Sequence, residues 1–478
     1  MRHEVADVVV IGSGAGGSVL AHAAASRGLR TLVVERGPYV RGRDMSHGEV
    51  EMFVRLYKDS GLQLNTSMDL VVLQGSCVGG STVLANNVMF RASDDVLSDW
   101  ERHGATLDRA ALACSYERIE RALGAGPSKP DNITNGSRLL YEGALAAGYD
   151  AHRMQTALGS CTGCGGCNTG CVWDHKPSAL TTFIPWAEAK GARVLADTTV
   201  DRIEWKQGTV TGLIGHTGEA REPIAISGKL VVVAGGAIGS SALLLKSGIR
   251  KNVGTRLSFN AGGTLLAEFP DAIDAFDGEQ MSCYVAGEGY TLEPVFSPPV
   301  SVAMMIPGWF EDHARLIANY RHLACAAALV GTLPNGRVVH SRFFGHEEIR
   351  FRIQHGDLAK LKAGFKAIAR AWFAAGAKRV VLPTHAFAAL EHPDEVDRID
   401  ALCASTRLFD IGSSHPQGGN PLSDDPNVGV VDGNFAVHGF DNLFVCDASV
   451  FTSSIRVNPL NTVMAIADYA APRILARA

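Results

Sequence analysis

A membrane-spanning segment is missing from the sequence, because its longest apolar runs end at a glycine, a serine or a charged residue before the roughly 20 residues that a bilayer requires. A cleaved secretory signal is not expected either. The chain starts with a basic residue and an apolar run from Val8, but that run continues into a glycine motif that cleavage would destroy. We therefore predict a cytoplasmic protein with no transmembrane segment.

Blocks of like charge are also absent. The 44 Lys and Arg residues are balanced by 49 Asp and Glu residues, which gives a formal net charge of -5. Binding to nucleic acid needs a concentrated basic face, so a nucleic-acid partner is not expected. Internal repeats and low-complexity segments are missing as well. With 46% hydrophobic and 19% charged residues, the 478-residue chain can bury a large core spread over two or three domains.

Cysteine is scarce and glycine is abundant. Ten cysteines are too few for a disulfide scaffold in a chain of this length, yet four of them fall within residues 161–171. The 52 glycines are clustered in short runs without a fixed period. This clustering excludes a collagen-like repeat and indicates tight backbone turns of the kind that surround phosphate groups.

The start of the chain reads as strand, turn, helix and strand. A buried parallel strand is predicted at 6–11, a helix from 18 to about 27, and a second strand at 29–34. The turn between the first strand and the helix carries the motif Gly12-x-Gly14-x-x-Gly17. The glycines allow backbone N–H groups to approach a pyrophosphate at the N-terminus of the helix.

Glu35 closes the second strand at the spacing that a dinucleotide-binding unit needs. Its carboxylate can accept hydrogen bonds from both ribose hydroxyl groups, and it would repel a 2′-phosphate. The fingerprint by itself does not distinguish NAD from FAD. Further along, one amphipathic helix is predicted, in which Leu358, Leu361, Phe365 and Ile368 recur at helical spacing.

Four stretches of the sequence resemble the glucose-methanol-choline (GMC) oxidoreductases, a family of FAD enzymes. They are residues 8–37, a second glycine-dense loop at 75–91, the segment 235–248 and the C-terminal part at 415–470. The resemblance is greatest to the branch of long-chain and secondary alcohol dehydrogenases. It implies an α/β fold, α+β overall, in which a mixed-sheet substrate domain is inserted into a Rossmann-like FAD-binding domain.

The resemblance also implies how the domains divide the sequence. The FAD-binding domain is discontinuous and comprises residues 1–95, 185–262 and 405–478. Residues 96–184 form a connecting region that contains the cysteine cluster, and residues 263–404 form the substrate-binding domain. The FAD positions that the resemblance implies beyond Gly12, Gly14, Gly17 and Glu35 are Gly79, Gly80, Asn86, Val200, Ala234, Gly235, Asp447, Pro459 and Thr462. Either Asn86 or its neighbour Asn87 reaches the flavin.

His415 and Asn458 occupy the positions that, by resemblance, face the flavin ring. Oxidation of an alcohol needs a base for the hydroxyl proton while hydride leaves the carbon, and histidine has a pKa suited to that role. An asparagine can hold the substrate oxygen so that one C–H bond faces the flavin. Independently of the family, Asn458 followed by Pro459 predicts the N-cap and first residue of a final helix.

Cys161, Cys164, Cys167 and Cys171 have the spacing C-x2-C-x2-C-x3-C, close to that of bacterial ferredoxins. We predict an iron–sulfur cluster, and a 4Fe-4S cluster in preference to a 3Fe-4S cluster. The fourth ligand stays open, since Cys77 or Cys114 could replace Cys171. A structural zinc site and disulfide bonds are the alternatives.

Together these features predict an FAD-dependent alcohol dehydrogenase that passes electrons through the cluster to an external acceptor protein or a quinone. Met304, Met305, Pro307, Trp309 and Phe310 favour an apolar or aromatic alcohol as substrate if they line its pocket. Three alternatives stay open: a lyase on the same flavin scaffold, an oxidase whose cysteines are only structural, and an inactive FAD-binding subunit.

Overall fold

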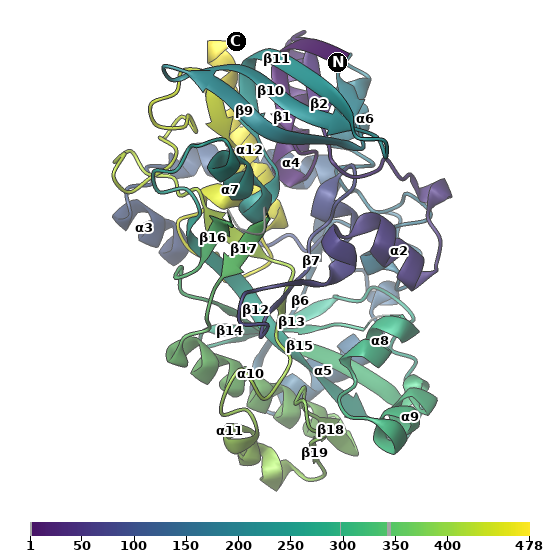
Figure 1. Ribbon diagram of the computed structural model, residues 1–478. Helices are drawn as coiled ribbons and strands as arrows, with labels where there is room; N and C mark the ends of the chain where they lie inside the picture. The colour runs from purple at the N-terminus through teal and green to yellow at the C-terminus, as the bar shows by residue number, and fades with distance from the viewer. Residues whose placement is uncertain (1, 297, 342–345) are drawn as a thin grey trace.

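Two β-sheets organise the protein (Figure 1). The computed structural model describes residues 2–296, 298–341 and 346–478. Both chain ends lie at the same end of the molecule, beside the first sheet (Figure 1). Strands and helices alternate through much of the chain, which confirms the mixed α/β class predicted from the sequence.

The first sheet is built around β1 (Arg2–Ile11). This strand pairs in parallel with β2 (Thr31–Val34) on one side and with β11 (Glu222–Val233) on the other. Beyond them lie β8 (Arg193–Leu195), which pairs with β2, and β22 (Leu443–Val445), which pairs with the end of β11. All of these pairs are parallel, so the carboxyl ends of the five strands meet at one edge of the sheet.

The strand, turn, helix and strand predicted at the start of the chain are confirmed. Helix α1 (Ala15–Ser26) follows β1 and returns the chain to β2. It packs against α6 (Phe183–Glu188) and against α12 (Leu460–Ile474), and α4 (Arg109–Leu123) packs against α12 in turn. These helices bury the apolar face of a sheet whose central strands are rich in valine.

An antiparallel extension completes the first sheet. β10 (Thr209–Thr217) pairs with the first residues of β11, and β9 (Thr198–Lys206) pairs with β10.

The last helix begins one residue later than the sequence predicted. Pro459 is the N-cap and Leu460 is the first helical residue, whereas Asn458 and Pro459 were expected in these roles. The side chain of Asn458 does not cap the helix: its Oδ1 atom has no partner among the described residues, and its amide nitrogen donates a hydrogen bond to Glu293, on the second sheet.

The second sheet is centred on the antiparallel pair β12 (Thr255–Glu268) and β15 (Leu323–Gly331). β14 (Tyr290–Pro294) pairs with β15, β13 (Cys283–Gly287) pairs with β14, and β6 (Asp150–Arg153) pairs with β13. This mixed set of strands forms the lower half of the molecule in Figure 1.

This sheet is not confined to residues 263–404, the segment predicted as the substrate domain. β12 runs through the predicted boundary at residue 263, and β6 comes from the predicted connecting region. Four further short strands of the sheet also come from outside the segment: β3 (Gln63–Leu64), β4 (Val71–Val72), β20 (Gly412–Ser413) and β21 (Pro416–Gly419). Strands of two to four residues carry too little periodic pattern to be assigned to a sheet from the sequence.

One face of the second sheet is covered by α10 (His355–Ala374), the amphipathic helix predicted from the sequence. Gly376 lies just after its end with a φ of +91°, as expected for a glycine that terminates a helix. Phe365 of this helix is fully buried and contacts Gly263 and the ring of Phe409. α5 (Asn135–Ala146) packs on the other side of α10.

The remaining elements are short or lie at the periphery. The other helices are α2 (Glu49–Leu56), α3 (Asp94–Arg102), α7 (Gly236–Lys246), α8 (Pro299–Met305), α9 (Phe310–Ala318) and α11 (Ile399–Leu402). The other strands are β5 (Gly126–Pro127), β7 (Gln155–Thr156), β16 (Arg337–His340), β17 (Glu347–Arg350), β18 (Arg379–Val381) and β19 (Ala389–Leu390). Within the described ranges, no helix has both the length and the apolarity that crossing a bilayer requires.

Replacing Phe365 with Ala should destabilise the protein, because it leaves a cavity between α10 and the second sheet. The free energy of unfolding should fall by about 3–5 kcal/mol, as measured by urea denaturation. Phe310→Ala is the matched control, since that ring is 85% exposed and its loss should change the stability by less than about 0.5 kcal/mol. Equal effects of the two changes would show that α10 does not form the core of this half.

Candidate active site

The residues predicted to hold a dinucleotide gather at the carboxyl edge of the first sheet. Gly12 follows β1, Glu35 follows β2, Ala234 and Gly235 follow β11, and Asp447 follows β22. Parallel pairing places these positions side by side although they are separated by up to several hundred residues in the sequence.

Gly12 is required by a close approach between two backbones. Its φ is +102°, and a Cβ atom at this position would lie 2.3 Å from the carbonyl oxygen of Ala234. A Cβ on Gly17 would lie 2.0 Å from the carbonyl oxygen of Gly12, so α1 also packs closely on the turn. Gly14 is the N-cap of α1 and provides no side-chain cap. The first N–H groups of α1 therefore remain available for a phosphate group.

Glu35 is buried and already makes three hydrogen bonds within the protein. One carboxylate oxygen, Oε2, accepts from the backbone N–H of Ser13 at 3.0 Å and from its hydroxyl group at 2.7 Å. The other, Oε1, accepts from the N–H of Gly37 at 3.0 Å. A carboxylate oxygen accepts about two hydrogen bonds, so Oε1 keeps one acceptor position. Glu35 can thus bind one ribose hydroxyl group here, and not the two expected from the sequence.

Asp447 joins the ends of β22 and β11. Its Oδ2 atom accepts from the N–H of Gly236 at 2.8 Å and from the hydroxyl of Ser240 at 2.5 Å, and Oδ1 accepts from the N–H of Ser449 at 2.8 Å. Burial raises the pKa of this carboxyl group, and these donors oppose the shift. Its position at the carboxyl edge agrees with the prediction, but its visible role is to fix the backbone around the site.

The second glycine loop lies against the first. A Cβ on Gly80, whose φ is +55°, would be 2.9 Å from the Cα of Gly14, and the N–H of Gly79 donates to the hydroxyl of Ser13 at 2.9 Å. The amide group of Asn87 is used within the protein, where it donates to the carbonyls of Ala157 and Pro177.

The amide nitrogen of Asn86 makes fewer hydrogen bonds within the protein than that of Asn87. In Asn86 the amide nitrogen lies 3.4 Å from the sulfur of Met281, a weak acceptor, whereas the Oδ1 atom, like that of Asn87, is buried without a partner among the described residues. Of the two neighbours, Asn86 is therefore the better candidate for contact with a cofactor.

Three predicted cofactor positions lie away from the sheet edge. Val200 is in β9, paired with Gly215. Pro459 caps α12, and Thr462 lies in the first turn of that helix, where its Oγ1 atom accepts a hydrogen bond from the hydroxyl of Tyr116 at 2.9 Å.

His415 lies between β20 and β21, in the loop that connects the two halves of the molecule. Its ring is partly buried, and its Nδ1 atom is enclosed without a hydrogen-bond partner in the described part of the chain. Burial lowers the pKa of His415 to about 4. The imidazole is therefore neutral near pH 7, which is the form that can accept a proton.

Gln417 links the two chain segments that carry His415 and Asn458. The side-chain amide of Gln417 donates to the carbonyl of His415 at 3.3 Å, and its oxygen accepts from the N–H of Ile455 at 2.9 Å, three residues before Asn458.

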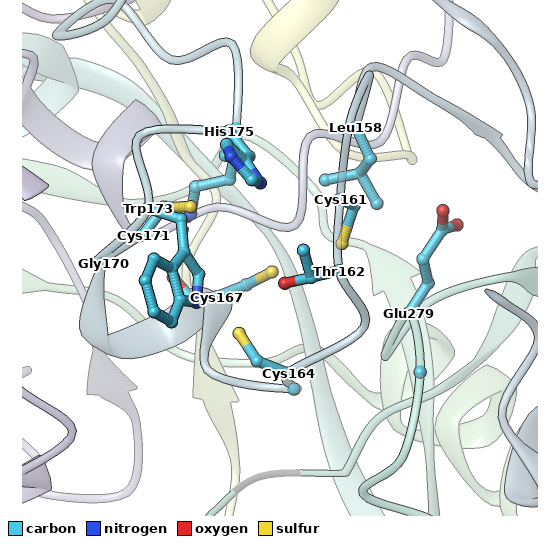
Figure 2. A pocket seen from close by; sticks show the side chains of 13 residues that line it. Leu158, Cys161, Thr162, Cys164, Cys167, Gly170, Cys171, Trp173, His175 and Glu279 are labelled. Atoms are coloured by element: carbon cyan, nitrogen blue, oxygen red, sulfur yellow. Dashed lines mark hydrogen bonds between the residues drawn. The ribbon is translucent and has the colours of Figure 1, made fainter.

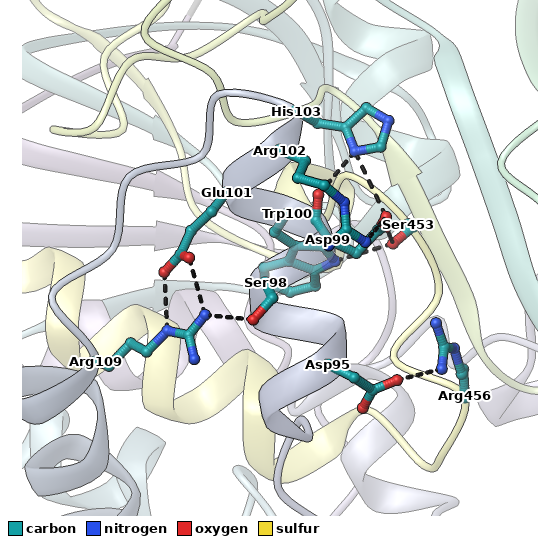
Figure 3. Close-up of polar contacts among 10 residues, drawn as sticks. All are labelled: Asp95, Ser98, Asp99, Trp100, Glu101, Arg102, His103, Arg109, Ser453 and Arg456. Carbon is teal, nitrogen blue, oxygen red and sulfur yellow. Dashed lines mark hydrogen bonds and ion pairs between the residues drawn. The ribbon is translucent and has the colours of Figure 1, made fainter.

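Helix α3 fixes the same segment from the other side (Figure 3). Ser453 donates to Asp99 at 2.9 Å and Arg456, whose φ is +66°, donates to Asp95 at 2.5 Å. The position of Asn458 is thus determined by contacts from two elements distant in sequence.

Glu293 is a further site residue that the sequence analysis missed. It is 1% exposed at the end of β14, and its Oε2 atom accepts a hydrogen bond from the amide nitrogen of Asn458 at 3.3 Å. Burial raises the pKa of Glu293 to about 7. In the sequence it is one acidic residue in an alternating strand, and only its inward position in that strand could have indicated the role.

Polar residues of the second sheet face the first domain. Alternation along the paired strands places Asn260 and Thr264 of β12 on the same face as Glu293, opposite the face that α10 covers. Buried side-chain atoms without partners among the described residues are concentrated around this face: both polar atoms of Asn260, Oε1 of Glu293, Nδ1 of His415 and Oδ1 of Asn458. Buried polar atoms are normally paired, so this arrangement fits a site that a bound cofactor and substrate complete.

The four clustered cysteines line one cavity (Figure 2). Their loop turns at glycines with positive φ, among them Gly163 and Gly170, and the N–H of Gly163 donates to the sulfur of Cys161 at 3.3 Å. A backbone bridge between Cys164 and Gly278 attaches the loop to the second domain. The sequence left open which cysteine would be the fourth ligand of a cluster. Cys171 is now the better candidate, because it lines the cavity while Cys77 and Cys114 do not.

All ten cysteines are free thiols in this structure. Within the described ranges, no three His, Cys, Asp or Glu side chains are placed to hold one metal ion directly. The cavity measures about 20 Å³, room for about one water molecule, so the thiol groups would have to turn outward to hold a cluster. The donors themselves, four sulfur atoms with a backbone N–H directed at one of them, are those that iron–sulfur clusters use.

Models of known protein families match most of this chain. A family model described as GMC oxidoreductase matches residues 53–261, and a second model with the same description matches residues 334–467. A model of an NAD(P)-binding Rossmann-like domain matches residues 10–55. The chain belongs to the GMC oxidoreductase family.

Relatives of this GMC oxidoreductase extend over nearly its whole length. It is 29% identical to an uncharacterized GMC-type oxidoreductase of Mycobacterium tuberculosis, over 99% of this chain and 76% of the relative. It is 25% identical to a long-chain-alcohol oxidase of Arabidopsis thaliana, over 98% of this chain and 67% of the relative. A solved structure of a formate oxidase from Aspergillus oryzae RIB40 has a TM-score of 0.77 at 14% identity and covers 100% of this chain and 99% of its own, which shows a shared fold.

One sequence-based expectation about this GMC oxidoreductase fails. Met304, Trp309 and Phe310, expected to line a substrate pocket or the core, are 67%, 81% and 85% exposed. Met304 lies near the end of α8, and Trp309 and Phe310 lie at the start of α9; α2 packs on α8 through Glu49, but these three side chains stay exposed. They therefore carry no information about the substrate.

The raised pKa of Glu293 predicts how the free energy of unfolding changes with pH. Unfolding returns this carboxyl group to its ordinary pKa of 4.5, so the folded state holds the proton between pH 4.5 and about 7 while the unfolded state loses it. Stability should therefore fall as the pH rises through that window, by roughly 3 kcal/mol for this group, and Glu293→Gln should remove that loss.

Urea denaturation of the two proteins from pH 4 to pH 8 measures this difference. Glu288→Gln is the control, since it removes an exposed carboxylate in the turn between β13 and β14. Parallel pH profiles for Glu293→Gln and the unmodified protein would contradict the burial of an uncompensated carboxyl group at this site.

Proposed function

We propose that the protein is an FAD-dependent oxidoreductase that oxidises the CH–OH group of an alcohol. The observation that supports this most directly is the group of His415, Asn458 and Glu293, which supplies a neutral imidazole and unpaired polar atoms beside the carboxyl edge of the nucleotide-binding sheet. FAD, when bound, supplies a ring that accepts hydride from the carbinol carbon.

The chain's own residues handle the alcohol proton. The Nδ1 atom of His415 has no partner among the described residues and can accept the hydroxyl proton as the carbonyl product forms. Asn458 keeps its Oδ1 atom and one N–H free to hold the hydroxyl oxygen, because its other N–H is donated to Glu293. This hydrogen bond orients the Asn458 amide, so the substrate oxygen is fixed relative to His415.

The residues at the carboxyl edge of the first sheet suit the binding of a dinucleotide. The first N–H groups of α1 bind the pyrophosphate, Glu35 binds a ribose hydroxyl through Oε1, and Asn86 lies on the loop that packs against Gly14. Gly79, Gly80, Ala234, Gly235 and Asp447 shape the backbone around it, with Val200, Pro459 and Thr462 at its margins.

The substrate we propose is an apolar alcohol. With Met304, Trp309 and Phe310 on the surface, the support comes from the relative in Arabidopsis thaliana, a long-chain-alcohol oxidase. The name of this relative also favours a second candidate function, in which oxygen is the electron acceptor and the cysteines are structural.

We propose the dehydrogenase rather than the oxidase because four thiols line one cavity. An iron–sulfur cluster held by Cys161, Cys164, Cys167 and Cys171 supplies one-electron transfer from the reduced cofactor to an external protein or quinone. The thiol groups and the N–H of Gly163 are the parts of the chain that would bind it.

His415→Ala should slow reduction of the flavin by an alcohol about 10²- to 10⁴-fold while the flavin stays bound, because the proton acceptor is lost. Anaerobic stopped-flow absorbance measures this rate. In the unmodified protein the flavin should bleach on addition of a long-chain alcohol. Aldehyde released from a cyanohydrin while the flavin stays oxidised would instead support a lyase, and a flavin-loaded protein inert to every alcohol tested would support an inactive subunit. His3→Ala, at an exposed histidine, is the control.

Cys164→Ser should lose iron and sulfide and should slow electron transfer to an artificial one-electron acceptor, while reduction of the flavin by alcohol continues. Iron and sulfide analysis of anaerobically purified protein and turnover with ferricenium measure the two effects. Cys114→Ser, at an exposed cysteine outside the cavity, is the matched control. Protein without iron that forms hydrogen peroxide in proportion to the alcohol consumed would establish the oxidase instead.

A further inference from the structure

Lys176 is a buried cation between the cysteine cavity and the second glycine loop. Its side chain is 3% exposed. The Nζ atom donates to the carbonyl oxygens of Val83 at 2.7 Å, Ala85 at 2.8 Å and Cys167 at 2.9 Å. The three carbonyl oxygens match the three N–H donors of an ammonium group, whereas burial lowers the pKa of Lys176.

A buried ammonium group needs an anion nearby. Transfer of an isolated charge out of water costs several kcal/mol even after the protein relaxes, and three carbonyl dipoles offset only part of this. In the described part of the chain, Lys176 forms no ion pair with a carboxylate. Its electrostatic neighbours are the thiol groups of Cys167, Cys171, Cys161 and Cys164, and Lys176 lines the same cavity as they do. One buried carboxyl group, that of Glu279, also lines this cavity, without an ion pair to Lys176 among the described residues.

Four neutral thiols do not compensate the charge, but four thiolates on a metal centre do. A metal centre held by four cysteines carries a net negative charge, and reduction makes it more negative. An anionic centre held by these four cysteines would therefore compensate the charge of Lys176. Lys176 was not among the residues that the cysteine spacing identified.

The same ammonium group also joins two parts of the site. Val83 and Ala85 belong to the loop that packs against Gly14 and that carries Asn86, while Cys167 belongs to the cysteine loop. Lys176 thus fixes the cysteine cavity against the loop proposed to contact the flavin, which is where a relay between the two must lie.

We propose that Lys176 is a positioning residue that provides the fixed counter-charge of an anionic metal–thiolate centre in the cysteine cavity and holds this centre against the flavin-binding loop. The inference rests on the metal centre of the proposed function. It implies that the charge of Lys176 favours both retention of the metal and the reduced state of the cluster.

Lys176→Met, which keeps the length and removes the charge, tests the proposal in the holoenzyme. The midpoint potential of the cluster should become more negative, so that at a fixed ambient potential the ratio of reduced to oxidised cluster falls roughly tenfold. Spectroelectrochemical titration measures this ratio, and analysis of iron, zinc and sulfide measures metal retention. Lys176→Arg should restore much of the potential, and Lys246→Met, at an exposed lysine, should leave it unchanged.

The outcomes separate the two proposals. An iron–sulfur cluster whose content and potential are the same in Lys176→Met overturns the role of Lys176 and leaves the cluster in place. Zinc without sulfide overturns the electron relay, and a several-fold loss of zinc in Lys176→Met would still support the counter-charge. Unmodified protein without any metal overturns both.

A second measurement tests the proposal even if the Lys176→Met variant folds poorly. In the Cys164→Ser background, where the metal is absent, Lys176→Met should cost less stability than in the metal-loaded protein, because the ammonium group has already lost its anion. A double-mutant cycle of thermal unfolding measures this coupling. Equal costs in the two backgrounds would contradict the proposal.

Discussion

The parallel pairing of β1 with β11 is the constraint on which the active site depends. The two strands are about 220 residues apart, yet they pair from Arg2 with Ile224 to Ile11 with Val233. This register presses the turn at Gly12 against the carbonyl of Ala234, at a distance that no other residue type allows. The same edge then receives the ends of β2 and β22, so the dinucleotide site is a consequence of sheet formation and not of any single loop.

A second constraint is the burial of polar groups between the two sheets. Asn260, Glu293, His415 and Asn458 keep polar atoms without partners in an enclosed space, and such atoms reduce the stability of the protein unless a ligand binds them. Burial also sets their charges. It keeps His415 neutral, as a proton acceptor must be, and brings the pKa of Glu293 close to the physiological range, so that near neutral pH the carboxyl group can carry a proton while the imidazole carries none.

The cysteine loop is part of this same arrangement. It is attached to the second domain through Gly278 and to the loop at 75–91 through Lys176. A metal centre in this position would lie at the junction of the two domains, with a cation already in place. The proposed electron relay would use this link to the loop at 75–91.

The sequence by itself determined the nucleotide-binding motif, the family, the cysteine cluster and the helix at 355–374, because each depends on local spacing: glycines in a turn, thiols in one loop, or apolar residues at helical intervals. Only the tertiary structure decided that Glu293 contacts Asn458, that Lys176 lies between the cysteines and the loop at 75–91, and that Trp309 and Phe310 are exposed. It also decided which short strands join the second sheet. These features depend on contacts between residues far apart in the chain, and burial, which fixes their charge and their chemistry, is a property of the packed fold and is not encoded in any one segment.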